Sequence, residues 1–186
     1  MGGFEPRGRH SQVRGQSARQ PAYEQPVTVS LEEAFHGGTR LMQLDGRRLE
    51  VKIPAGARTG TKIRMAGAGP AGRGGQTSDI YLVIDVAEDS RFAREGDDLT
   101  TEVEIDLYAA VLGGETRVTT LDGQVVLKIP AGTQPGQSIR LKGKGMPQLK
   151  TSKVRGDLFV KIKVRLPKNL TSEERKLFEE LAGGSK

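Results

Sequence analysis

The stretches VKIPAGARTGTKIRMAGAGPAG (residues 51–72) and LKIPAGTQPGQSIRLKGKGMPQ (residues 127–148) are two versions of one sequence. Both contain Lys-Ile-Pro-Ala-Gly, then Ile-Arg, then glycines at alternate positions. The match extends beyond them at a constant offset of 76 residues, which pairs Leu31 with Leu107 and Gly37 with Gly113. Two copies are too few for a solenoid, which needs about three or more stacked units. The repeat therefore predicts two tandem domains of the same fold.

The composition favours small β-rich domains and excludes several kinds of site. Of the 186 residues, 35% are apolar and only 4% aromatic, so Val, Ile and Leu must build the cores. The absence of cysteine excludes disulfides, thiolate metal sites and a cysteine nucleophile. No apolar run approaches the ~20 residues that cross a bilayer, and the first residues lack the apolar core of a signal peptide. We expect a cytoplasmic protein that needs no metal or cofactor and does not contact a membrane.

The chain divides into four segments. Residues 1–26 are rich in Gly, Gln, Arg and Pro and read as a flexible linker. Residues 27–97 and 98–167 hold the two copies, each predicted to be a β-sandwich or half-barrel with one short helix. Residues 168–186 hold a final helix and a tail. The predicted fold class is therefore mainly β.

Each copy is predicted to run from a first strand, through a short helix and a hairpin, to a closing strand. The first strands are residues 27–31 and 101–107, and the closing strands are residues 78–86 and 156–164. Asp-Gly pairs at the hairpin turns are typical of type I′ turns.

Capping residues mark the predicted helices. Ser30 with Glu33 forms a capping-box pair, and Asp106 is the matching N-cap in the second copy. Gly37 and Gly113 are predicted to end the two helices in the left-handed conformation.

The final helix is predicted from LTSEERKLFEEL, in which Thr171 and Glu174 form a second capping box. Leu177, Phe178 and Leu181 share one face of this helix. A helix of about 11 residues is marginal alone, so we expect this face to dock on its own domain or on another chain.

Motifs that resemble catalytic or nucleotide sites lack the context those sites need. GAGPAG (residues 67–72) matches G-x-G-x-x-G, but no helix start follows it, and the second copy loses the third glycine. Asp79 and Asp157 recur at matching positions, each at the start of a strand, where a solvated role or hydrogen bonding to a turn is the favoured interpretation. No set of residues suggests a nucleophile with its base, so we expect a protein that is not an enzyme and has no catalytic residues.

The copies differ in the character of their hairpins. We align Met42 with Val118 and Leu44 with Thr120, and the strand residues Val27 and Val29 with Thr101 and Val103. The first copy thus keeps apolar residues where the second has threonines. Ordinary core packing explains this pattern as well as a shallow groove for apolar side chains does, and the sequence alone leaves both interpretations open.

The motifs together resemble the C-terminal substrate-binding region of the DnaJ family of co-chaperones, from Val27 to Leu181. The segments that carry the resemblance, in order, are SLEEAFHGG, FAREGDDL, VLGGETRVTTLDG, LKIPAGTQPGQSIRLKGKGMP, RGDLFVKIKV and LPKNLTSEERKLFEEL. Having no cysteine, the chain is similar to the zinc-free class and to the curved-DNA-binding relatives. Asp89 and Ser90 stand where the family usually has His-Pro. Neither histidine is followed by Pro-Asp, so the family's J-domain motif is absent, and we expect this sequence to be part of a longer protein.

The resemblance implies a function and a set of sites. It implies a chaperone module that binds apolar segments of unfolded polypeptides, passes them to a DnaK-type chaperone and forms a homodimer through the C-terminal helix. The implied dimer contacts are Leu177, Phe178 and Leu181. The implied client-binding residues are Val27, Val29, Met42 and Leu44, with Arg40 at the rim.

The basic residues leave a second interpretation open. The net charge is +6, and residues 123–156 contain seven basic residues and no acid. Such a surface is compatible with a merely solvated face, with an acidic partner protein or with sequence-independent DNA binding, although this chain has few aromatic residues for stacking on bases. The residues expected to make such contacts are Lys52, Lys62, Lys142, Lys144, Lys150, Lys153 and Arg155.

Overall fold

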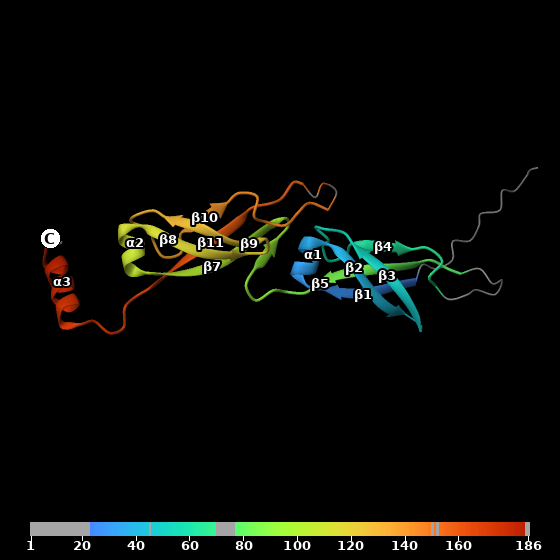
Figure 1. The fold of residues 1–186 in the computed structure, drawn as a ribbon, viewed down its shortest axis with the longest axis horizontal. Coiled ribbons are helices and arrows are strands. Elements are labelled where there is room, and N and C mark those ends of the chain that lie inside the picture. The colour runs from blue at the N-terminus through green and yellow to red at the C-terminus, as the bar shows by residue number, and fades with distance from the viewer. Residues whose placement is uncertain (1–22, 45, 70–76, 150, 152, 185–186) are drawn as a thin grey trace, which may run out of the picture.

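The computed structural model describes residues 23–44, 46–69, 77–149, 151 and 153–184. Its described part is mainly β, with three helices, and both copies of the repeat form the expected small domains (Figure 1). The elements are β1 (Tyr23–Val29), α1 (Leu31–His36), β2 (Gly38–Leu44), β3 (Arg47–Ile53), β4 (Lys62–Met65), β5 (Ile80–Val86), β6 (Ala93–Glu95), β7 (Asp98–Asp106), α2 (Leu107–Leu112), β8 (Gly114–Thr120), β9 (Gly123–Ile129), β10 (Ser138–Leu141), β11 (Leu158–Arg165) and α3 (Ser172–Gly183).

Each domain packs a hairpin against a sheet whose first and closing strands run parallel. In the first domain the sheet order is β1-β5-β4 and the hairpin is β2-β3. In the second domain the sheet order is β10-β11-β7-β6 and the hairpin is β8-β9. Alternate residues of these strands are buried, as in β3 and β9, where the same pattern of exposure recurs residue for residue. The two sandwiches are thus built on one plan.

The second sheet gains a strand that the first sheet lacks. β6 pairs with the first residues of β7, from Asp98 to Thr100, so it belongs to the second domain although it precedes residue 98. β1 has no such neighbour and is an outer strand of its sheet in the described structure. The first strand also begins at Tyr23, four residues before the start that the apolar alternation predicts.

The predicted N-caps of the two short helices are confirmed. The Ser30 hydroxyl accepts a hydrogen bond from the backbone N–H of Glu33, whose carboxylate accepts one from the Ser30 N–H. Asp106 caps α2 by accepting from the Ala109 N–H at 2.7 Å. Gly37 ends α1 with φ 66° but ψ −173°, so the expected left-handed helical conformation is wrong and the chain turns directly into an extended strand.

The strand alignment Val27–Thr101 and Val29–Val103 is wrong by two residues. Leu31 and Leu107 each begin the short helix, so Val27 corresponds to Val103 and Val29 to Ile105. The error arose because both strands alternate apolar and polar residues, and a shift of two preserves the alternation.

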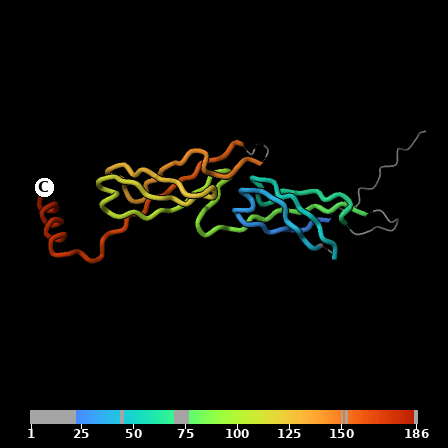
Figure 2. Tube along the Cα trace, in the orientation of Figure 1, coloured from blue at the N-terminus to red at the C-terminus, as the bar shows by residue number. Residues whose placement is uncertain are grey.

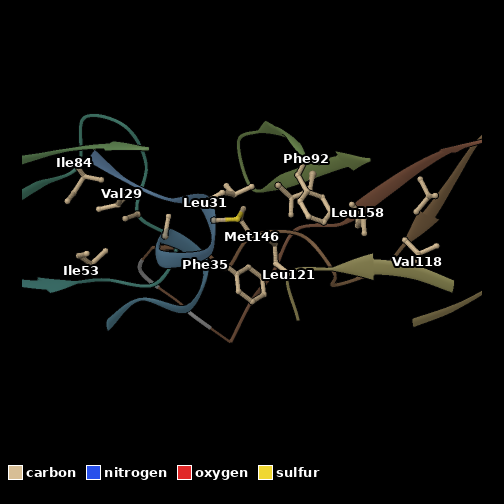
Figure 3. Close-up of a cluster of buried hydrophobic side chains, with 14 of the residues drawn as sticks. Val29, Leu31, Phe35, Ile53, Ile84, Phe92, Val118, Leu121, Met146 and Leu158 are labelled. Carbon is tan, nitrogen blue, oxygen red and sulfur yellow. The ribbon is translucent and has the colours of Figure 1, made fainter. Parts of the chain in front are cut away.

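The two domains stack rear to front (Figures 1 and 2). In each domain we call the end that carries the short helix the rear, and the opposite end, at the hairpin turn, the mouth. The mouth of the second domain faces the rear of the first domain, and buried side chains form one cluster across the boundary (Figure 3). Among the described residues, no second sandwich lies in front of the mouth of the first domain, at the other end of that domain. Among the described residues, no helix is long and apolar enough to cross a membrane.

Candidate functional site

The mouth of the first domain presents half-exposed apolar side chains from both layers of the sandwich. On the sheet, Tyr23 and Met65 flank Ile80 in one cross-strand row. On the hairpin, Met42 lies opposite Leu49, and both side chains are half-buried. Deeper along the same faces the side chains are fully buried, so these residues form the open end of the core.

The mouth of the second domain is closed at the matching positions. Val118, which corresponds to Met42, is 1% exposed, and Leu99, which corresponds to Tyr23, is also buried. The chain between the domains covers this end: Phe92 is buried, and the Thr101 hydroxyl donates to the Arg91 carbonyl oxygen at 2.9 Å. The copies therefore differ because the second mouth is covered by the first domain and by residues 87–97, which connect β5 to β7 and which we call the linker between the domains.

The client-binding residues expected from the resemblance fall into different environments. Met42 lies at the open mouth, where its flexible thioether suits varied apolar partners. Val27 and Val29 are buried in the core and have almost no surface to offer in this conformation. The backbone of Leu44 lies in β2 opposite Arg47.

Arg40 ties the two layers of the first domain together. Its Nη1 donates to the Thr28 carbonyl oxygen of β1 at 2.9 Å and lies 3.8 Å from the Glu33 carboxylate. The guanidinium therefore closes the gap between β1 and β2 beside α1, rather than lining the mouth.

Sequence reasoning missed three mouth residues, namely Tyr23, Leu49 and Met65. Tyr23 lay in the segment assigned to the linker, and Leu49 and Met65 look like ordinary core residues in strand alternation. The signal was present in the repeat, since Leu99 aligns with Tyr23, but only the stacking of the domains shows which of the two is covered.

The rear of the second domain also carries exposed apolar side chains. In the first domain Phe35 of α1 is 3% exposed, whereas Val111, its counterpart on α2, is 57% exposed. Tyr108 and Leu112 beside it are exposed as well. A hollow of about 290 Å³ adjoins this surface, lined by Leu107, Ala110, Val111, Thr133, Gln134, Pro135, Val164 and Leu166.

The C-terminal helix lies next to this rear surface. Phe178 is half-buried, and its ring centroid is 6.5 Å from that of Tyr108. Leu177 and Leu181 are exposed, Leu181 at 71%. Among the described residues of α3 none is buried, so the apolar face of the helix is only partly covered within one chain.

The basic residues do not gather into one site. Lys62 pairs with Glu24, and Arg155 and Lys144 both lie near the Asp122 carboxylate, at 2.9 and 3.6 Å. Arg155 and then Lys144 hold the pKa of Asp122 below its usual value. Lys52, Lys142 and Lys153 are exposed, and Lys150 lies outside the described residues.

A second hollow, of about 1320 Å³, runs along the linker between the domains. Charged side chains of both signs line it, including Arg58, Glu88, Glu102, Arg117 and Lys161. Apolar residues, among them Leu31, Val86 and Phe92, also line it, so its lining is mixed.

The recurring aspartates bind glycine turns, which is one of the two roles expected for them. Asp79 accepts from the Gly67 N–H at 3.0 Å, and Asp157 accepts from the Gly143 N–H at 2.8 Å. Each carboxylate also pairs with an arginine of the neighbouring strand, Arg64 or Arg140. These carboxylates therefore have a structural role. Of the GAGPAG motif (residues 67–72), the last three residues lie outside the described part of the chain.

Comparison with known proteins shows the family to which the chain is similar. Residues 23–167 match the DnaJ C terminal domain family. Over 158 residues, or 85% of this chain and 49% of the relative, the sequence is 47% identical to Chaperone protein DnaJ of Deinococcus proteolyticus. Over 150 residues, or 80% of this chain and 39% of the relative, it is 48% identical to Chaperone protein DnaJ of Brucella canis.

A third relative, Chaperone protein DnaJ 2 of Thermus thermophilus, is 41% identical over 169 residues, or 91% of this chain and 58% of the relative. The chain thus spans about half the length of the curated relatives it matches. The DNA-binding alternative draws no support from these relatives. The matched family covers both sandwiches, and the chain belongs to the DnaJ C-terminal domain family.

Proposed function

We propose that this chain is a non-enzymatic chaperone module that binds apolar segments of unfolded polypeptides at the mouth of its first domain. The observation that carries the proposal is the contrast between half-buried Met42 and fully buried Val118 at matching positions. The relatives named as DnaJ chaperones support the same role. In this proposal Met42, Leu49, Tyr23 and Met65 hold one client side chain between the sheet and the hairpin.

A single mouth binds weakly. Burying one client Leu or Phe contributes ~1.5–3 kcal/mol, and ordering a flexible client offsets part of that. Affinity in the micromolar range or weaker follows, which suits a protein that passes its client to a DnaK-type chaperone. Two mouths joined in a dimer would hold a long client by raising the effective concentration of the second site.

We propose that the rear of the second domain and α3 form the dimer contact. The rear of the first domain buries Phe35 beneath the second domain, whereas Val111 at the equivalent position of the second domain is 57% exposed in the described structure. The apolar face of α3, with Leu177, Phe178 and Leu181, has complementary chemistry and lies beside this surface. A second copy of the chain would bury both surfaces.

The client site is tested by replacing Met42 with serine. Because Met42 is only partly buried, Met42→Ser should leave the fold intact while weakening client binding several-fold, measured by fluorescence anisotropy with a labelled apolar peptide and by suppression of aggregation of a denatured enzyme.

The matched control is Leu41→Ser, one residue away on the opposite face of β2 and 73% exposed. Loss of one exposed leucine outside the mouth should change peptide affinity by less than twofold. Equal weakening by both variants, or unchanged binding by Met42→Ser, would overturn the assignment.

A further inference from the structure

The boundary between the domains is packed at the level of the backbone. A Cβ placed on Gly56 would lie 2.8 Å from the Leu149 nitrogen and closer still to the Pro147 carbonyl oxygen. Gly56 belongs to the turn after β3 in the first domain, and residues 147–149 belong to the loop between β10 and β11 in the second. No side chain fits between these two segments.

Apolar packing continues this contact. Met146 is fully buried and lies between Leu31 and Phe35 of the first domain and Leu121 of the second (Figure 3). The Arg155 guanidinium stacks 4.9 Å above the centre of the Phe35 ring and donates to the Asp122 carboxylate at 2.9 Å. A cation held over an aromatic face by its own carboxylate is a directional contact.

Arg94 ties the linker to both sides of this boundary. It lies in β6, which pairs with β7 of the second domain, yet its Nη1 donates to the Ala57 carbonyl oxygen of the first domain at 2.8 Å. Its Nε donates to the Gly96 carbonyl oxygen at 2.9 Å. Next to it, Arg58 of the first domain donates to Asp97 at 2.7 Å.

The backbone of Asp97 itself packs against the second domain. The carbonyl oxygen of Asp97 accepts from the Met146 N–H at 2.7 Å and lies against Gly145 and Gly156, where added Cβ atoms would collide with it. Burial and the nearby Arg58 lower the pKa of Arg94, and Asp97 opposes them, so the half-buried cation keeps a compensating charge beside it.

We propose that Gly56 and Arg94 are positioning residues that lock the two domains into one rigid arm. Gly56 admits the close backbone approach, and the fork of Arg94 fixes the linker across it. The open mouth of the first domain is therefore held at a fixed distance and angle from the second domain. This inference concerns the joint alone and does not depend on the proposed chaperone function.

The repeat supplies a matched control for the decisive variant. Gly132 corresponds to Gly56 and has nearly the same backbone, with φ 78° against 83°, but nothing lies within 4 Å of its Cβ position. Gly56→Ala and Gly132→Ala therefore introduce the same conformational strain, and only the first inserts an atom into the joint.

The test measures domain orientation in the full chain by residual dipolar couplings of backbone amides. In the wild type and in Gly132→Ala, one alignment tensor should fit both domains. In Gly56→Ala the domains should need two tensors, while the amide shifts of core residues Ile84 and Ile162 stay unchanged.

Arg94→Ala is the second variant and should also separate the tensors, whereas Arg64→Ala, whose Asp79 partner lies in the same domain, should not. Should Gly56→Ala fail to fold, Arg94→Ala decides alone. One shared tensor in Arg94→Ala, or two tensors already in the wild type, would overturn the proposal.

Discussion

Several polar residues in this chain stabilise turns and the contact between the two domains by hydrogen bonds and ion pairs. Asp79 and Asp157, which recur in the two copies, each hold the backbone of a glycine turn and an arginine of the neighbouring strand. Their repetition in sequence reflects a repeated structural task. Such residues can be read from one sequence because the turn and its acceptor lie in the same domain.

The ionisation of Asp79 should appear directly in the Gly67 amide. The Gly67 N–H, then Arg64, hold the pKa of Asp79 below its usual value. Since the pKa is lower in the folded state, the carboxylate stabilises the first domain at pH values above about 3.9, and this contribution is lost as pH falls through the folded-state pKa.

A pH titration by NMR checks this. The Gly67 amide shift should move with a midpoint below about 3.9. In Asp79→Asn the amide should lose that titration, and the midpoint of urea unfolding of the first domain should depend less on pH between pH 6 and 3. A midpoint above 4.5 in the wild type would contradict the expected direction.

At the scale of elements, short-range signals were read correctly and long-range ones were not. The capping boxes at Ser30 and Thr171 are confirmed because a cap depends on residues three positions apart. β6 was missed because its three residues form a strand only by pairing with β7. The sequence of β1 was aligned two residues out of step with that of β7, its equivalent in the second domain, because the alternation of apolar and polar residues repeats every two residues.

Replacing the α1 cap tests how much this short helix depends on it. Ser30→Ala removes the acceptor for the Glu33 N–H and should lower the free energy of unfolding by about 1 kcal/mol. Ser30→Asp keeps an acceptor oxygen and should retain most of that stability. Urea unfolding followed by circular dichroism gives both values, and equal losses in the two variants would rule out the capping contribution.

For the whole molecule, the decisive property is which surfaces the stacked domains cover. Sequence alone predicted two similar domains, raised the possibility of a shallow apolar groove on the first, and predicted a C-terminal helix with an apolar face that packs on its own domain or on another chain. It did not distinguish Met42 from Val118, because the burial of Val118 depends on the first domain lying at the mouth of the second domain, and no described part of the chain lies at the first mouth in the same way. Tandem duplication gives two similar sites, and stacking leaves them with different accessibility.

Truncation tests the proposed dimer. Deleting residues 171–186 removes Leu177, Phe178 and Leu181 and should shift the protein from dimer to monomer at micromolar concentration. Analytical ultracentrifugation measures the mass. Deleting only residues 185–186 is the control and should leave the dimer intact. A dimer that survives the larger deletion would refute the role of α3.

The placement of the open mouth and α3 at opposite ends of the chain has a consequence for substrate length (Figure 1). If two chains dimerise through α3, the two open mouths lie far apart at the outer ends of the dimer, and one polypeptide must extend between them to occupy both. An extended chain covers at most ~3.3–3.6 Å per residue, so short substrates reach only one mouth. Peptides with two apolar segments joined by Gly-Ser spacers should therefore bind no better than single segments until a threshold spacer length, and markedly better beyond it. The dimer would then select substrates by length and favour long, unfolded chains over small flexible fragments.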